Sequence, residues 1–247
     1  MTDPFLDLPP DNERWGHATG PGAEGVELHY VRQGSGDPVV LLHGWPGFWY
    51  DWRRVLPPLG GEADAIAPDL RGSGDSGKPE RPPEEGYTPL HLARDVVALM
   101  DHLGLAEATV VAHDVGATVA QAMALTVPDR VRSLVLLNPP YLGIGHRRYD
   151  ARIQREHWYQ HFHAQPWSDR LVGYDRETVR LYLSHFYDHW TGRKEALRPV
   201  ELEAIVDVYA RPGTVRGGFQ FYRARWVTWP QDFPQEASPE DFAIKVP

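Results

Sequence analysis

Asp114 is the residue whose type and neighbours point most directly to chemistry. It follows a run rich in β-branched apolar residues and precedes a helical pattern, and the small residues Ala112 and Gly116 flank it by two positions. This is the strand–turn–helix layout of a nucleophile elbow, in which a strained central residue points out over the sheet. A carboxylate is already ionised at neutral pH, so it can attack a saturated carbon without a base and form an alkyl ester. An aspartate that caps the following helix is the structural alternative.

The composition narrows the class of protein. The 247 residues carry a formal net charge of −9 and include no cysteine. The mildly acidic charge, without a basic block, argues against nucleic acid or an anionic membrane as the partner. The lack of cysteine excludes a disulfide framework, a thiol nucleophile and a Cys-ligated metal site. Because the chain shows neither a signal-peptide pattern nor a membrane-length apolar run, we expect a cytoplasmic protein with a small-molecule ligand.

The elements that must position Asp114 alternate between strands and helices. Apolar runs predict strands at 27–33, 39–42, 63–67, 109–112 and 131–137, and helical patterns lie at 49–59, 88–103 and 117–126. This alternation predicts an α/β fold with a doubly wound, mostly parallel sheet. Ligands of such sheets bind beyond the carboxyl ends of the strands, where residues 43–47, 69–75 and 138 would join Asp114. Neither a metal-ligand pattern nor a dinucleotide-binding glycine motif is present, so we expect no metal and no cofactor.

The character of the chain changes near Tyr141. Buried β runs give way to helical segments rich in aromatic residues, at 149–165, 176–190, 200–209 and 217–228. We therefore divide the chain into a core at 1–140, an all-helical cap at 141–241 and the start of a returning core strand at 242–247. Most cap aromatics would form the core of the cap itself. These are Trp158, Phe162, Phe186, Trp190 and Trp226.

Three motifs together carry a family resemblance. They are a His-Gly-Trp-Pro-Gly run at 43–47, an Asp-Leu-Arg-Gly-Ser-Gly-Asp-Ser run at 69–76 and His-Asp-Val-Gly at 113–116. In this order and spacing they resemble the α/β-hydrolase fold, in the branch whose nucleophile is an aspartate. That branch includes epoxide hydrolases and the haloalkane and fluoroacetate dehalogenases. The resemblance covers essentially the whole chain and implies that Asp114 is the nucleophile.

Two tyrosines in the cap favour the epoxide hydrolases within this branch. Tyr159 stands seven residues before Pro166, as does the first cap tyrosine of epoxide hydrolases, and residues 217–223 resemble the segment that carries the second, here Tyr222. Opening a strained ether generates an alkoxide, which two phenols can stabilise and protonate. The implied reaction opens a small-molecule epoxide to a vicinal diol through an ester at Asp114. Core packing is the structural alternative for each tyrosine.

The resemblance also assigns the surroundings of the nucleophile. It implies an oxyanion hole made by the backbone N–H groups of Trp45 and Val115, while His43 orients its loop. The side chains expected to contact substrate are Trp45, Pro46, Phe48, His113 and Tyr141.

Departures from the family pattern leave alternatives open. Haloalkane dehalogenases place Trp, and fluoroacetate dehalogenases place Arg, where this chain has Val115. A haloalkane or haloacid dehalogenase is nonetheless the alternative enzyme. The family also needs a His and a carboxylate to activate water, and Asn138 stands where some relatives carry the acid. We expect both groups after Pro247, in a longer protein.

The missing base leaves a third interpretation open, that of a non-catalytic ligand-binding relative. A homo-oligomer is compatible with the sequence.

Overall fold

The computed structural model describes residues 8–139, 151–232 and 243–247. Within these residues six strands form one sheet in the order β1-β2-β4-β3-β5-β6. Strands β3 to β6 run parallel to one another, whereas β2 pairs antiparallel with both β1 and β4. The predicted mostly parallel α/β sheet is therefore confirmed. The strands are β1 (His17–Pro21), β2 (Glu27–Gly34), β3 (Pro38–Leu42), β4 (Asp64–Pro68), β5 (Ala108–His113) and β6 (Val131–Leu137).

Continuous apolar runs form the centre of the sheet. Residues 40–42 of β3 and 65–67 of β4 are buried on both faces, as expected of parallel strands covered by helices. The sequence did not predict β1, because its short His-Ala-Thr-Gly-Pro run lacks an apolar alternation. Pairing with β2 nevertheless holds it in the sheet, with His17 opposite Val31.

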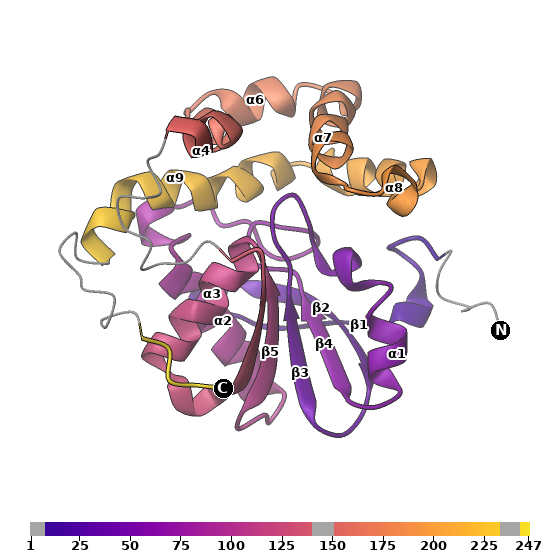
Figure 1. Ribbon diagram of the computed structural model, residues 1–247, viewed down its shortest axis with the longest axis vertical. Coiled ribbons are helices and arrows are strands. Elements are labelled where there is room, and N and C mark those ends of the chain that lie inside the picture. The colour runs from indigo at the N-terminus through magenta and orange to yellow at the C-terminus, as the bar shows by residue number, and fades with distance from the viewer. Residues whose placement is uncertain (1–7, 140–150, 233–242) are drawn as a thin grey trace.

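Helices cover both faces of the sheet, with α1 (Leu56–Gly60) on one side and α2 (Pro89–His102) and α3 (Val115–Thr126) on the other (Figure 1). The side chain of Thr88 caps α2 by accepting from the N–H of His91, as predicted. The prediction of a single helix at 49–59 is wrong. A 3-10 turn and α1 replace it, because two consecutive prolines fit only the first turn of a helix. The 3-10 turns are Glu13–Trp15, Ala23–Gly25, Trp49–Trp52, Pro83–Glu85, Pro128–Arg130 and Lys194–Ala196.

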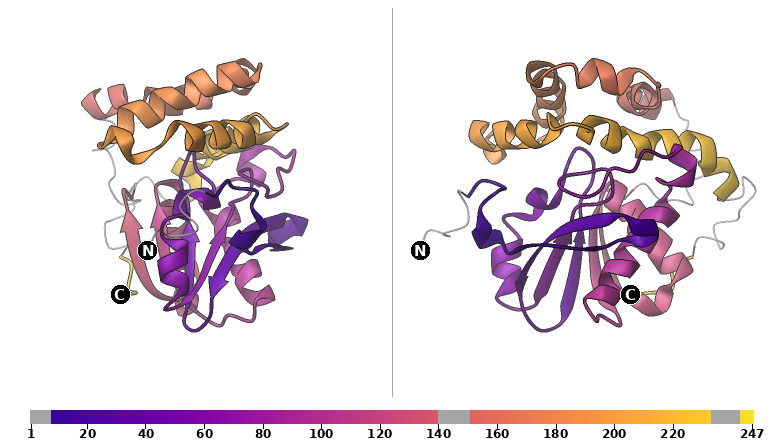
Figure 2. Two further views of the ribbon diagram at one scale, coloured as in Figure 1. Left: turned by 90° about the vertical axis from the view of Figure 1, so that its right-hand side faces the viewer. Right: turned by 180° about the vertical axis from the view of Figure 1, so that it is seen from behind.

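A second layer of helices lies across one end of the sheet (Figure 1, Figure 2). Two of its helices, α7 and α8, follow the predicted bounds closely. The helix expected at 149–165 is interrupted at His157, whose ψ of 18° departs from helical geometry, and α6 was not predicted. We call α4 to α9 the helical layer. They are α4 (Ala151–Glu156), α5 (Trp158–His163), α6 (Ser168–Val172), α7 (Arg176–Trp190), α8 (Pro199–Tyr209) and α9 (Thr214–Asp232).

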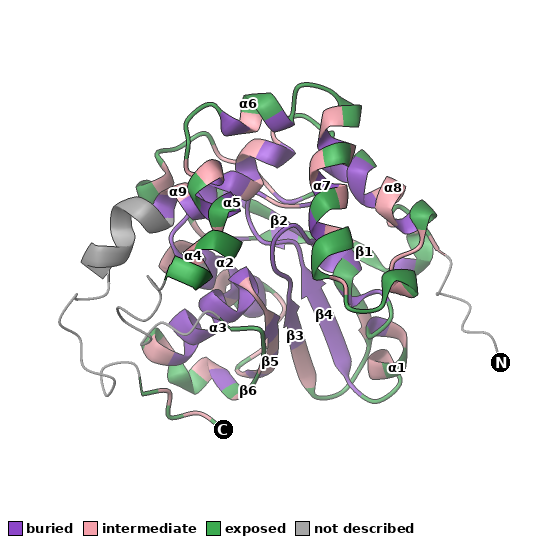
Figure 3. Cartoon of the chain, turned by 45° about the horizontal axis from the view of Figure 1, so that its top comes forward, coloured by how far each residue is buried: buried purple, intermediate pink, exposed green. Residues whose placement is uncertain are grey.

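Buried residues occur on both sides of the junction between the helical layer and the sheet (Figure 3). At one point of this junction, Glu201 of α8 is buried and accepts hydrogen bonds from Arg53 Nε at 2.9 Å and Arg54 NH2 at 3.1 Å. Burial opposes ionisation of Glu201, but the Arg198 N–H and the Arg53 guanidinium outweigh it and lower its pKa to about 2. The layer is therefore held to the core by a buried charge pair as well as by apolar contact.

Residues 243–247 return to the sheet without forming a strand. The N–H of Leu134 donates to the carbonyl of Pro247 at 2.7 Å, and the side chain of Val246 packs against the core. The predicted start of a core strand thus corresponds to an irregular segment beside β6. In the part of the chain that the structure describes, no helix combines the length and apolarity needed to cross a membrane.

Candidate active site

The turn between β5 and α3 holds Asp114 in a strained backbone conformation, with φ of 48° and ψ of −113°. Its side chain makes no capping bond to α3, so the helix-capping alternative is excluded. The turn is tight because α3 approaches β3 closely. A Cβ at position 116 would lie 2.5 Å from the carbonyl oxygen of His43, and one at position 44 would lie 2.6 Å from Asp114 Cβ. Only glycine fits at these two positions.

Backbone amides hold the carboxylate of Asp114. The N–H of Trp45 donates to Oδ2 at 3.1 Å, and the N–H of Val115 faces the same carboxylate. Burial raises the pKa of Asp114, while these two amides and the nearby His113 and His157 oppose the rise. The amides that the sequence predicted for an oxyanion hole therefore contact the predicted nucleophile itself.

His43 braces the loop that presents the Trp45 amide. Its Nε2 accepts from the N–H of Leu70 at 3.0 Å, which leaves Nδ1 to donate to the carbonyl of Gly44 at 2.8 Å. Burial lowers the pKa of His43, so the neutral ring that these two bonds require is favoured. Its contacts match the orienting role expected from the sequence.

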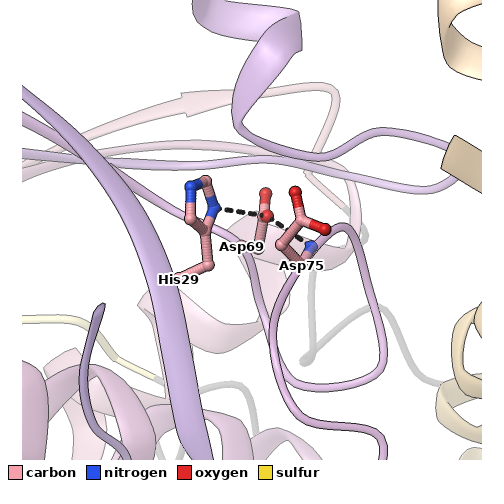
Figure 4. A group of neighbouring side chains, drawn as sticks. All are labelled: His29, Asp69 and Asp75. Carbon is pink, nitrogen blue, oxygen red and sulfur yellow. Dashed lines mark hydrogen bonds and ion pairs between the residues drawn. The ribbon is translucent and has the colours of Figure 1, made fainter. Parts of the chain in front are cut away.

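Asp69 braces the neighbouring loop in the same way (Figure 4). Its Oδ1 accepts from the N–H of Trp49 at 2.7 Å, and its Oδ2 contacts Nδ1 of His29 at 2.8 Å and the N–H of Asp75 at 2.9 Å. His29, Asp69 and Asp75 are close enough to resemble metal ligands. Both oxygens of Asp69 already bond to protein groups, however, and Asp75 pairs with Arg211, so the cluster is explained as a brace.

A cavity of about 550 Å³ opens beside Asp114, within the range usual for small-molecule sites. Both the sheet and the helical layer contribute to its wall. The described lining residues are Trp45, Pro46, Asp51, His113, Asp114, Asn138, Glu156, His157, Tyr159, Phe186, Tyr187, Trp190 and Thr191.

Trp45 lies at the centre of the aromatic wall of this cavity. Its indole stacks on Tyr159 with ring centroids 5.6 Å apart and meets Tyr222 edge-on at 5.9 Å. The two tyrosine rings are 5.8 Å from each other. Gln160 Nε2 donates to the phenol oxygen of Tyr159 at 3.1 Å. Burial holds the pKa of Tyr222 well above its ordinary value, so this phenol keeps its proton.

The structure brings together most of the residues that the sequence singled out. Trp45, Pro46, His113, Asp114 and Tyr159 all line the cavity. Tyr222 is not among the described lining residues, but its ring contacts Trp45 and Tyr159, which are.

Two of the predicted substrate contacts need separate comment. Phe48 does not line this cavity, because it is buried in the core and stacks on Tyr50 with ring centroids 5.9 Å apart. Tyr141 lies outside the described residues.

Sequence reasoning missed the contribution of α7 and of Asp51. Phe186 and Trp190 were assigned to packing within the cap, and they do pack on Tyr159, but they also line the cavity. Their spacing of four residues, which places both on one face of a helix, was the available signal. Nothing in the sequence pattern marked Asp51, which follows the aromatic run 48–50.

Comparison with known proteins agrees with this geometry. Residues 37–185 match the family described as alpha/beta hydrolase fold. The chain is 36% identical over 203 residues to the soluble epoxide hydrolase of Corynebacterium sp. (strain C12), which covers 80% of this chain and 68% of that protein. It is 32% identical to a fluoroacetate dehalogenase of Burkholderia sp., covering 81% and 66% of the two chains.

The solved structure of the epoxide hydrolase CorEH without ligand superposes on this chain with a TM-score of 0.77. The match has 35% sequence identity and covers 84% of this chain and 72% of that one. The chain spans between 56% and 68% of the length of the curated epoxide hydrolases that match 80% or more of it. The chain therefore belongs to the α/β-hydrolase fold family, on the epoxide hydrolase branch, which has dehalogenases among its relatives.

Proposed function

We propose that this protein opens epoxides to vicinal diols through an ester formed on Asp114. The observation that carries the proposal is the position of the Asp114 carboxylate, which backbone amides hold at the wall of a cavity beside two buried tyrosines. The epoxide hydrolases among its relatives support the same activity. In this proposal the helical layer acts as a cap that closes the cavity over the substrate.

The first step is displacement at a saturated carbon. With Oδ2 held by the Trp45 amide, Oδ1 of Asp114 attacks one epoxide carbon, and the bond from that carbon to the epoxide oxygen breaks. The electron pair stays on the oxygen as an alkoxide. The phenols of Tyr159 and Tyr222 donate hydrogen bonds to this oxygen, and one of them supplies its proton.

The second step is hydrolysis of the ester. Water attacks the carbonyl carbon of the esterified Asp114, and the oxyanion that forms takes the place of Oδ2, where the Trp45 and Val115 amides donate. The bond from this carbon to the substrate oxygen then breaks, one proton of the water completes the diol, and the other returns to the tyrosine phenol, so that Asp114 is left as the carboxylate. The family resemblance assigns activation of the water to a His held by an acid after Pro247.

A dehalogenase is the second candidate, because a fluoroacetate dehalogenase is among the relatives. The same attack by Asp114 would then expel a halide. The charge of the cavity favours the epoxide, since none of its described lining residues is Lys or Arg, whereas three of them are carboxylic acids. A haloacid would therefore meet an unfavourable field.

Intact-mass measurement after incubation with styrene oxide tests the first step. We expect the protein mass to increase by the mass of one styrene oxide, with the adduct on the peptide that contains Asp114. Where the ester is hydrolysed, we expect 1-phenylethane-1,2-diol in solution. Asp114→Ala should abolish both signals because it removes the attacking oxygen. Asp129→Ala, which changes an exposed acid, is the matched control and should react like the wild type.

Two outcomes would overturn the proposal. An adduct or diol that persists in Asp114→Ala would show that another group reacts. Halide release from a haloalkane or haloacid, without any reaction with styrene oxide, would select the dehalogenase.

A further inference from the structure

The cavity wall contains a second carboxylic acid that the proposed mechanism does not use. Asp51, in the 3-10 turn Trp49–Trp52, is exposed to the cavity that Asp114 also lines. It also lines a neighbouring cavity of about 360 Å³, and His113, Tyr187 and Thr191 are shared between the two cavities. Asp51 thus lines two neighbouring cavities, of which the larger also contains the predicted nucleophile.

The carboxylate of Asp51 has no hydrogen-bond or ion-pair partner among residues 8–139, 151–232 and 243–247. The nearby cation, Arg53, is committed elsewhere. Its Nε donates to Glu201 at 2.9 Å, its NH1 donates to the carbonyl of Tyr50 at 2.9 Å, and its guanidinium lies over the Tyr50 ring. A carboxylate that is open to the cavity and has no partner in the described part of the chain is available to pair with a cationic group of a ligand.

Glycine at position 47 leaves space for this carboxylate. A Cβ at Gly47 would lie 1.8 Å from Asp51 Oδ2, so the carboxylate occupies the space that a side chain at position 47 would fill. Any side chain at position 47 would therefore displace the carboxylate from its present position.

The surroundings of Asp51 make its charge state sensitive to pH. Burial raises the pKa of Asp51 to about 6, while His113 and Arg53 lower it and Asp69 raises it further. Tyr187 and Tyr209 also face it, since the charge of Asp51 raises the pKa of both phenols. At neutral pH the carboxylate is therefore mostly ionised.

The rest of the main cavity suits a cation. Asp51, Asp114 and Glu156 contribute negative charge, and its described lining contains neither Lys nor Arg. Aromatic faces from Trp45 and Trp190 add to the wall, and such faces attract ammonium groups.

We propose that Asp51 is a specificity-determining residue that pairs with a protonated amine on the substrate, next to the aromatic wall that binds its apolar part. The part of this inference that concerns substrate rests on the proposed function, and it narrows that function to amine-bearing epoxides as the favoured class. As a statement about binding it requires no reaction at Asp114. The two can therefore be tested separately.

The test compares three unreactive probes of one shape: benzylammonium, benzyl alcohol and benzoate. Binding to the protein is followed through tryptophan fluorescence, because Trp45 and Trp190 line the cavity. We expect benzylammonium to bind at least about tenfold more tightly than benzyl alcohol, as one charge-assisted hydrogen bond provides, and benzoate to bind most weakly. Asp51→Asn keeps the shape and removes the charge, so the ratio of the first two affinities should fall about tenfold.

Asp129→Asn is the matched control, since it removes an exposed acid elsewhere and should leave the ratio unchanged. The pH dependence of the affinity ratio in the wild type is a second test, which does not depend on whether the Asp51 variant folds. Between about pH 8 and pH 5 the alkylammonium stays protonated, so the ratio should fall as the pH drops through about 6 and Asp51 takes up a proton. Asp51→Asn should lose that step.

Equal binding of benzylammonium and benzyl alcohol by the wild type at neutral pH would overturn the inference. So would an unchanged ratio in a folded Asp51→Asn protein. If styrene oxide forms the Asp114 ester while the ratio is near one, only this inference fails. If the ratio depends on Asp51 while no epoxide reacts, the proposed function fails and the amine site stands.

Discussion

At the scale of single residues, Asp114 is held between two opposing influences. Burial at the cavity wall favours its neutral form, and the amides of Trp45 and Val115 favour the carboxylate. A partly desolvated carboxylate is a stronger nucleophile than one in water, because less hydration must be removed when it attacks. The strained φ of 48° keeps this carboxylate at the cavity rather than at the end of α3.

The raised pKa of Asp114 predicts a pH dependence of ester formation. Only the ionised carboxylate attacks, and its folded pKa lies above the ordinary 3.8. The rate with styrene oxide should therefore fall as the pH drops through that raised pKa, at a higher pH than for an exposed aspartate. Stopped-flow fluorescence of ester formation gives the profile. Repeating it in Asp51→Asn removes the other titrating cavity acid, and a fall that vanished there would assign the dependence to Asp51 instead.

The two tyrosines predict a specific loss of rate. Tyr159→Phe and Tyr222→Phe should each slow ester formation by about 10- to 100-fold, because each removes one donor to the developing alkoxide. The double variant should be slower than either. Tyr174→Phe changes an exposed tyrosine, 81% accessible in the same layer, and should react normally. Normal epoxide opening by the double variant would assign both rings to packing alone.

At the scale of elements, the contact between α8 and the core turn at 49–54 fixes where the helical layer sits. Glu201 is the residue through which α8 makes this contact, because it pairs with Arg53 and Arg54 from the core. The side chain also accepts from the N–H of Arg198 at 2.8 Å, so one carboxylate both begins a helix and anchors it. The contact that positions α8 therefore also helps to shape the cavity that Asp51 and α8 both line.

Removing this charge should loosen the helical layer. Glu201→Gln leaves Arg53 buried without its counter-charge, so the free energy of unfolding should fall by about 2 kcal/mol, measured by urea denaturation. Glu203→Gln, two residues along the same helix in an exposed pair with Arg176, should change little. Because the pKa of Glu201 is lowered to about 2, its contribution is present above about pH 4.5 and is lost as the pH falls toward 2. Equal unfolding curves for the two variants would contradict this account.

At the scale of the whole molecule, what the sequence could predict follows from how local each feature is. Strands β2 to β6 and α7 were predictable, because the burial of strands and helical spacing leave periodic patterns in the chain. The turn that holds Asp114 was predictable because a tight turn between strand and helix restricts its neighbours to small residues. Each of these patterns lies within a single segment of the chain and can be recognised without knowing what that segment contacts.

The rest depended on contacts between distant segments. The paired role of Trp190, in packing and in lining the cavity, depends on how α7 is placed relative to His113 at the end of β5, which lines the same cavity. The position of Asp51 beside a second hollow depends on how α7 and α8 meet the core. Helix breaks such as that at His157 are decided by packing too, and single-sequence periodicity does not record them.

Trp45 belongs both to the contact that holds Asp114 and to the aromatic wall of the cavity, which a protein engineer would wish to alter independently. Its peptide nitrogen donates to Asp114, while its indole is packed among Tyr159, Phe186 and Tyr222. A substitution that trims Phe186 to admit a bulkier molecule therefore also removes packing from the side chain of the residue whose backbone N–H holds Asp114. Pocket size and reactivity cannot be tuned separately here, and libraries aimed at a wider entrance should vary Trp45 and its ring neighbours together.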